Sequence, residues 1–123
     1  MMSGLLVPVA AGAAFLISGA WYGTLGSRLA ALSPAYAGPN RPAAATAAVE
    51  LARNLALALA ILVLVDGRSA GGALLLALLL WVAFPVVLLA GSVFHERVPP
   101  QLAAIHAGDW LLKLLAVTAV LSI

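Results

Sequence analysis

The chain has little charge and no cysteine, and both deficits narrow its possible folds. Only 8% of its 123 residues are charged, whereas charged residues make up about a quarter of a typical soluble domain. This shortage excludes a soluble globular fold and a disordered tail, and the missing cysteines exclude disulfides and zinc-thiolate sites. The six Lys and Arg residues occur singly, so the sequence has no basic run that could bind nucleic acid.

Apolar residues take the place of the missing charge. They account for 65% of the sequence, and the mean hydropathy is +1.17. Because crossing a bilayer takes about 20 mostly apolar residues, we predict an all-α membrane protein, a single domain over residues 1–123 with four transmembrane helices in an antiparallel bundle. We expect the first helix to be retained, since it lacks the basic start of a cleaved leader. The predicted helices span residues 4–25, 43–65, 71–93 and 102–123.

The connections between these helices indicate their orientation. The first connection, residues 26–42, is a proline-containing loop, whereas the other two are short, so consecutive helices should be antiparallel neighbours. The first and third connections share one side of the membrane and carry three arginines, against one in the second. By the positive-inside rule, we expect those two connections in the cytoplasm and both termini outside a bacterial cytoplasmic membrane. The arginines are Arg28, Arg41 and Arg97 on one side and Arg68 on the other.

Small residues recur at four-residue spacing in the first two helices, a pattern that marks helix-contact faces because it lets backbones approach closely in membranes. The two repeats exceed what one four-helix unit needs, so we expect one of them to form a subunit interface, with a homodimer as the assembly. In the third helix, Pro85 should remove a backbone hydrogen bond and kink the helix. The repeats are Gly19, Gly23 and Ser27 in the first helix and Ala44, Ala48, Ala52, Ala56 and Ala60 in the second.

Three segments occur together in an order that resembles a known family. They are Gly19-Ala20-Trp21-Tyr22-Gly23, Leu80-Trp81-Val82-Ala83-Phe84 and Ala104-Ile105-His106-Ala107-Gly108-Asp109-Trp110-Leu111-Leu112. In this combination the chain resembles the family called domain of unknown function 1761, and the resemblance covers most of its length. It implies a small bacterial four-helix membrane protein with no assigned activity, and it transfers no catalytic residues. A Gly-Tyr pair is expected in the last helix of that family, so a site at Asp109 would be particular to a subgroup.

Charged residues inside the predicted helices are the main functional signal, because an ionised side chain at mid-bilayer costs roughly 2.5 to 3.5 kcal/mol. Spacings of three and four residues place each of two acid-base pairs on one helix face. The acids of helices two and four lie at matching depths, and so do the bases. We therefore predict that these helices touch, with a carboxylate of one in salt-bridge reach of a base on the other. The candidate polar site comprises Glu50, Arg53, Asn54, His106, Asp109 and Lys113.

Two interpretations of this cluster remain open. In the first, the charges neutralise one another and lock helix two to helix four. In the second, they surround a hydrated pocket that opens toward the first and third connections. His106 beside Asp109 would then accept protons, and any binding or transport should change between about pH 5 and 8, where histidine normally titrates. The candidate rim of the pocket comprises Trp21, Tyr22, His95, Glu96 and Trp110.

Three classes of function fit these features. The favoured one is a binding or transport module in which the charged cluster handles a proton or small solute. The alternatives are a structural or accessory membrane protein with helix-locking salt bridges, and a cofactor-free enzyme that uses Glu50, His106 or Asp109 as acid and base on a lipid-soluble substrate. Metal-ligand spacings are absent from the sequence, so we predict no metal and no other cofactor. The expected partners are the lipid bilayer and a second copy of the chain, and the identity of any small-molecule ligand stays open.

Overall fold

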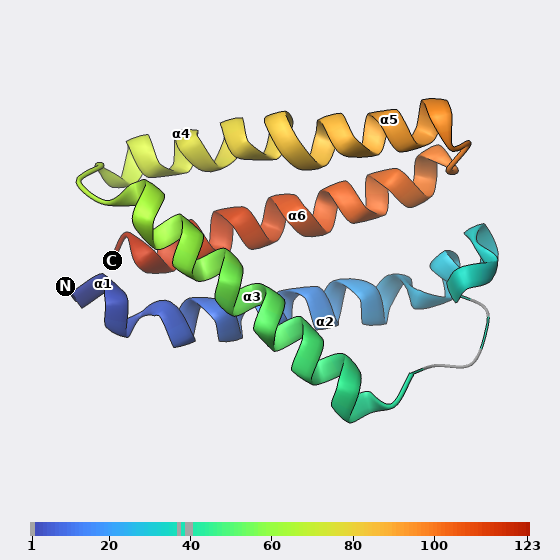
Figure 1. Ribbon diagram of the computed structural model, residues 1–123, viewed down its shortest axis with the longest axis horizontal. Coiled ribbons are helices and arrows are strands. Elements are labelled where there is room, and N and C mark those ends of the chain that lie inside the picture. Colours follow the sequence, from blue (N-terminus) through green and yellow to red (C-terminus); the bar gives the residue numbers. More distant parts are fainter. Residues whose placement is uncertain (1, 37, 39–40) are drawn as a thin grey trace.

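The computed structural model describes residues 2–36, 38 and 41–123, and the secondary structure of this part of the chain is entirely helical (Figure 1). Four helical stretches are each long and apolar enough to cross a membrane. The predicted fold class is therefore confirmed. The elements are α1 (Met2–Leu5), α2 (Val7–Leu32), η1 (Pro34–Tyr36), α3 (Ala43–Val65), α4 (Ala70–Trp81), the π-helical η2 (Val82–Val86), α5 (Val87–His95) and α6 (Pro100–Leu121).

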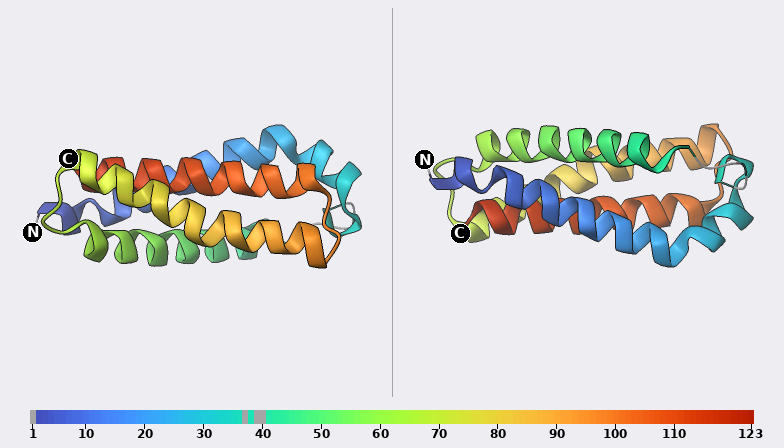
Figure 2. Two further views of the ribbon diagram at one scale, coloured as in Figure 1. Left: turned by 90° about the horizontal axis from the view of Figure 1, so that it is seen from above. Right: turned by 90° about the horizontal axis from the view of Figure 1, so that it is seen from below.

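The four stretches run back and forth along the long axis of the molecule. Both termini and the α3–α4 link lie at one end, and the α2–α3 and α5–α6 connections lie at the other (Figures 1 and 2). The last helix, α6, is central because it packs against α2 and α4 and also touches α3 and α5. α3 packs mainly on α2, and in Figure 1 it crosses the bundle obliquely, so that its amino-terminal half diverges from the other helices.

The first long helix extends beyond its predicted end. It continues to Leu32 instead of stopping at residue 25, because no proline occurs between Val9 and Ser33. In an apolar medium, water does not compete for the backbone hydrogen bonds that glycines leave uncovered, so glycines alone do not end a helix there. Ser33 has extended backbone angles, as is usual for the residue before a proline, and it ends the helix. The first connection is therefore shorter than predicted, and Arg28 lies on the helix.

Pro85 widens the third span without interrupting it. The span runs from Ala70 to His95 and includes the π-helical turn Val82–Val86, which contains Pro85. Proline has no backbone N–H, and its ring collides with the carbonyl four residues earlier in an α-helix. An extra residue in the turn relieves this collision. The sequence predicted a kink at this proline, and the structure accommodates it in a π-helical turn.

Two apolar clusters separated by a polar layer form the core. The larger cluster lies toward the termini and joins α2, α3, α4 and α6, and the smaller one joins α2 and α6 toward the opposite end. Between the clusters, the buried face of three helices becomes polar: α2 at Ser18, α3 at Asn54, and α6 at Asp109 and Lys113. Each of these residues lies near the middle of its helix. The polar layer therefore lies about midway along helices that are long and apolar enough to cross a membrane.

The small-residue repeats lie on outward surfaces of the subunit. A Cβ atom added to Gly19 or Gly23 would meet nothing within 4 Å. Ser27 and all five alanines of the second repeat are exposed. Neither repeat is thus a contact face inside the subunit, and a role in a subunit interface stays a prediction.

Candidate functional site

A buried ion pair on α6 forms the centre of the polar layer. Nζ of Lys113 lies 3.0 Å from Oδ2 of Asp109, and Oδ1 of Asp109 accepts a 2.5 Å hydrogen bond from Oγ of Ser18 on α2. Asp109 is 2% exposed and Lys113 is 3% exposed. Desolvating such ions costs several kcal/mol each, and the direct ion pair and the charge-assisted hydrogen bond offset that cost. The ring of Trp110 adds a cation-π contact, with Nζ of Lys113 4.2 Å from its centroid.

Two further buried polar atoms have no hydrogen-bond partner within the described part of the chain. They are Nδ2 of Asn54 on α3 and Oγ1 of Thr118 on α6. Asn54 is only 1% exposed, and leaving a buried donor unpaired costs about 1 to 3 kcal/mol. Such costs are usually tolerated where a group serves a purpose besides stability. Nδ2 of Asn54 therefore gives the polar layer hydrogen-bonding capacity for a further polar partner.

His106 lies one helical turn before Asp109 on α6, but its hydrogen-bond partners are tyrosines of two other elements. Oη of Tyr22 on α2 is 2.7 Å from Nδ1, and Oη of Tyr36 in η1 is 3.1 Å from Nε2. A neutral imidazole donates from one nitrogen and accepts at the other, so one tyrosine hydroxyl donates to the ring and the other accepts from it. The sequence predicted that His106 lies beside Asp109 and accepts protons, and the structure adds two tyrosine hydroxyls that bond to the ring.

Two tryptophans attach neighbouring helices to the backbone of α6. Nε1 of Trp21 on α2 donates to the carbonyl of Ile105, and Nε1 of Trp81 on α4 donates to the carbonyl of Ala107, each over 2.8 Å. Gly108 makes room for the first of these indoles, because a Cβ atom there would lie 2.5 Å from Cζ2 of Trp21. The part of α6 that carries the site is thereby held between α2 and α4.

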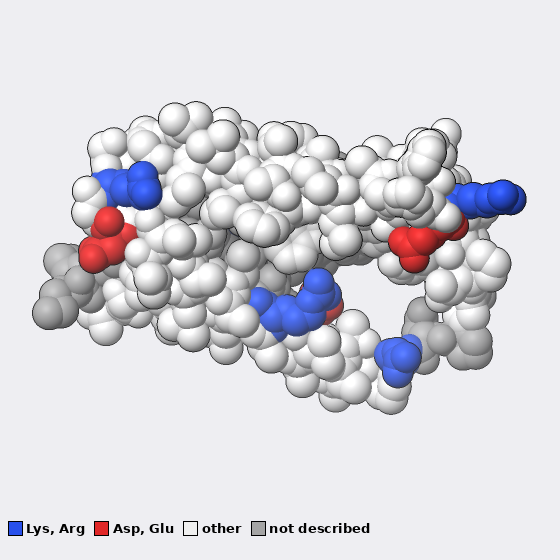
Figure 3. Space-filling view, turned by 45° about the horizontal axis from the view of Figure 1, so that its top comes forward, with Lys and Arg blue, Asp and Glu red and all other residues white. Residues whose placement is uncertain are grey.

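The other predicted ion pair lies apart from this centre. Nη1 of Arg53 is 2.7 Å from Oε1 of Glu50, but their side chains are 54% and 30% exposed. α3 and α6 do touch, yet both ion pairs of the described residues lie within a single helix, so the predicted interhelical salt bridge is wrong. Matching depths along two helices do not determine how each helix is rotated, and α3 turns Asn54 into the core. Figure 3 shows charged atoms at both ends of the molecule and beside an opening between α3 and the other helices.

The structure brings together only part of the predicted pocket rim. Trp21 and Tyr22 pack against α6 next to the ion pair, and Trp110 covers its ammonium group. His95 and Glu96 are exposed at the α5–α6 connection, at the end of the molecule (Figure 1). We therefore separate these two residues from the candidate site.

Comparison with protein-family models supports the resemblance seen in the sequence. Residues 5–122 match the family described as "Protein of unknown function (DUF1761)", which is nearly the whole chain. The chain belongs to the DUF1761 family. No curated protein and no solved structure matched it. Because the DUF1761 description assigns no activity, the function of the site has to be argued from its geometry.

Two side chains of the site in this DUF1761 protein have no place in the sequence-based prediction. Ser18 follows Ala11 and Ala14 on the buried face of α2, so helical periodicity is a signal that could have identified it. Tyr36 offers no comparable signal, because it lies in a short turn 70 residues away from His106 in the sequence. Only the path of the chain brings Tyr36 to the imidazole.

Proposed function

We propose that this membrane protein is a proton-binding module, in which His106 exchanges protons with the side of the α2–α3 and α5–α6 connections. The observation that carries the proposal is the hydrogen-bonded series Tyr36, His106 and Tyr22, which uses both nitrogens of the imidazole. Tyr36 is 43% exposed, whereas Tyr22 lies within the membrane-spanning part of α2. The series therefore leads from the surface toward the polar layer.

The chemistry of the imidazole fits proton exchange with this side. A proton that reaches Nε2 from the Tyr36 side creates an imidazolium, whose Nδ1–H donates to the hydroxyl oxygen of Tyr22. Loss of the Nε2 proton back toward Tyr36 restores the neutral ring, so one proton is bound and released on the same side.

Protonation of His106 also acts on the ion pair. An imidazolium one helical turn from Asp109 competes with Lys113 for the carboxylate, because charges this close interact strongly in a poorly screened environment. A weakened ion pair would leave the Asp109 carboxylate, together with Nδ2 of Asn54, available to a small polar solute. Proton binding and solute binding are thus coupled in this proposal.

The geometry favours proton exchange with one side over conduction through the membrane. Beyond the polar layer, Thr118 is the one buried polar side chain among the described residues, and it does not titrate. Ala10, Ala14, Ala58 and Val117, each 0% exposed, fill the bundle there. A proton that reaches Asp109 has no comparable series of groups leading to the end that carries the termini.

Nuclear magnetic resonance of the protein in lipid nanodiscs tests the proposal. The variant His95→Gln leaves His106 as the single histidine, so the imidazole nitrogen signals report its protonation between about pH 5 and 8. The indole signal of Trp110 reports on Lys113, whose ammonium lies over that ring. We expect both signals to change over the same pH interval.

Three variants sharpen this experiment. His106→Gln should abolish the pH dependence of the Trp110 signal, whereas His95→Gln, the matched change at the exposed helix end, should preserve it. Tyr36→Phe should slow proton exchange at the imidazole without displacing Trp110. If the Trp110 signal does not change when His106 is protonated, the histidine is structural and the proposal fails.

We further propose that the protein forms a homodimer in the bacterial cytoplasmic membrane, with both termini outside. The outward-facing glycine and alanine repeats support the dimer. The orientation is supported by Arg28, Arg41 and Arg97, which lie toward the end of the bundle opposite the termini, against Arg68 at the α3–α4 link. Labelling of cysteines introduced at Gly38 and Gly67 with a membrane-impermeant reagent tests the orientation, because only the second should react from outside.

A further inference from the structure

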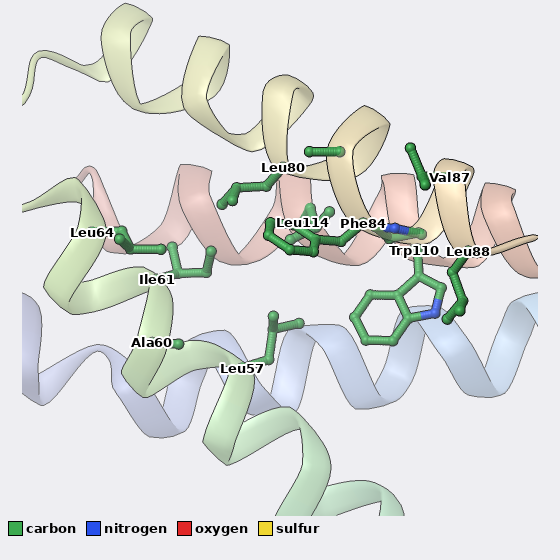
Figure 4. Close-up of a pocket in the computed structure, with 12 residues that line it drawn as sticks. Leu57, Ala60, Ile61, Leu64, Leu80, Phe84, Val87, Leu88, Trp110 and Leu114 are labelled. Carbon is green, nitrogen blue, oxygen red and sulfur yellow. The ribbon is translucent and has the colours of Figure 1, made fainter.

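A second feature with the shape of a binding site lies on the lipid-facing side of the bundle. α3 forms one wall of a groove and the α4–α5 span forms the other, while α6 provides its floor (Figure 4). The groove has a volume of about 560 Å³, and its lining is almost entirely apolar. Side chains that line it include Leu57 and Ala60 of α3, Phe84 and Leu88 of the opposite wall, and Trp110 and Leu114 of the floor.

The groove exists because the two walls are kept apart. α3 diverges from the bundle, and small side chains face the space from both sides, Ala60 on α3 and Ala83 in the π turn. Pro85 also lines the groove, so the widened turn that this proline imposes contributes to its shape. Within a bilayer the surrounding medium is acyl chain, and an occupant must therefore be apolar over most of its length.

A charged pair continues the groove-lining row of α3. Leu57, Ala60 and Leu64 line the groove at helical spacing, and one and two turns nearer the amino terminus the same row reaches Arg53 and Glu50. Charges inside a membrane-spanning helix normally find polar partners, yet the Arg53 side chain is 54% exposed. Its guanidinium has N–H groups beyond the one that binds Glu50.

The charges of Arg53 and Glu50 determine which kind of head group can bind beside them. Glu50 already neutralises Arg53, so a second anion would be left without a counter-charge in an apolar layer. A neutral oxygen, such as a carbonyl or hydroxyl, can accept from the remaining N–H groups without that penalty.

From the continuity of the apolar groove with this charged pair, we infer that the protein binds a neutral lipophile that enters sideways from the bilayer. Its apolar chain or ring system occupies the groove between α3 and the α4–α5 span, and its carbonyl or hydroxyl head accepts from Arg53. The volume lies within the range of about 300 to 1,000 Å³ that is usual for small-molecule sites. This site does not depend on His106, so it can be tested separately from proton binding.

Photolabelling in nanodiscs with a long-chain alcohol that carries a diazirine on its chain tests the inference. Labelling should saturate, should be competed by the unmodified alcohol, and should map to residues 57–64 and 80–88. Ala60→Trp and Ala83→Trp fill the groove from opposite walls, and each should reduce saturable labelling at least tenfold. Ala119→Trp adds the same side chain at an exposed alanine outside both the groove lining and the small-residue repeats and should leave the labelling unchanged.

The head group is tested with a charge-neutral double variant. Glu50→Gln with Arg53→Met should weaken binding of the alcohol about tenfold, as expected for loss of a hydrogen bond from a charged donor, and should leave the matching alkane unaffected. The inference is overturned if labelling does not saturate, since bulk lipid then explains it, or if Ala60→Trp labels as the wild type does. Two other outcomes would also overturn the inference. One is a cross-link between two copies of the chain at residues 57–64 with no labelling by the alcohol. The other is tighter binding of the matching carboxylic acid than of the alcohol. His106→Gln should label normally.

Discussion

Gly108→Ala should destabilise the protein, although alanine is the better helix former. The added Cβ atom would lie 2.5 Å from Cζ2 and 3.0 Å from Cη2 of Trp21. Carbon atoms pack at about 3.5 to 4.0 Å, so the indole has to move by roughly 1 Å. Nε1 of Trp21 donates a 2.8 Å hydrogen bond to the carbonyl of Ile105. A shift of the ring therefore strains this hydrogen bond, which joins α2 to α6.

The magnitude follows from three contributions. Forcing a side chain out of a packed site costs about 1 to 3 kcal/mol, and weakening a hydrogen bond costs about 1 kcal/mol. Replacing glycine by alanine inside a helix stabilises the helix by about 1 kcal/mol. We therefore expect Gly108→Ala to lower the free energy of unfolding by about 1 to 3 kcal/mol. Gly12→Ala, where nothing lies within 4 Å of the added atom, should raise it by up to about 1 kcal/mol.

Reversible unfolding in mixed detergent micelles measures these differences, and a double-mutant cycle identifies their cause. Phenylalanine lacks the Cζ2 edge of the indole, so in a Trp21→Phe background Gly108→Ala should cost at least about 1 kcal/mol less than in the wild type. If Gly108→Ala matches Gly12→Ala, or if its cost is the same in both backgrounds, the steric argument is refuted.

Three further predictions concern the polar layer and the assembly. Ser18→Ala should lower the free energy of unfolding by about 1.5 to 3 kcal/mol, because it removes a hydrogen bond to a buried carboxylate, whereas Ser27→Ala on the exposed face should have little effect in the same micelle assay. Asp109→Asn leaves Lys113 buried without its counter-charge and should cost about 3 to 5 kcal/mol. Adding Lys113→Met should recover most of that loss, and equal stability of the single and double variants would contradict this account. Gly19→Cys should form a covalent dimer on oxidation in native membranes, and a monomer at every oxidant concentration would count against an interface at the glycine repeat.

Helix number and approximate helix position were predictable because they depend on local properties. The bounds of α3 are as predicted, since charge and proline flank its apolar run. The end of α2 was not predictable in the same way, because glycines end helices in water more readily than in lipid. The distortion at Pro85 was predictable from its missing N–H, but its π-helical form depends on the local backbone geometry.

The candidate site was predictable in composition and not in arrangement. Asp109 and Lys113 pair as their four-residue spacing indicates. The spacing of Glu50 and Arg53 likewise indicates their contact. What separates the two pairs is the rotation and tilt of α3, which result from the packing of its whole buried face.

The amino-acid sequence by itself determined that the chain has four segments long and apolar enough to cross a membrane, and which charged residues lie within them. These properties follow from the transfer of single residues and short segments out of water, which is a local free energy. Tertiary structure alone decided that Ser18 binds Asp109, that Tyr36 and Tyr22 bind opposite nitrogens of His106, and that a groove opens beside α3. Each of these depends on how helices distant in sequence are rotated and tilted against one another, and side-chain packing summed over entire helix faces sets that geometry.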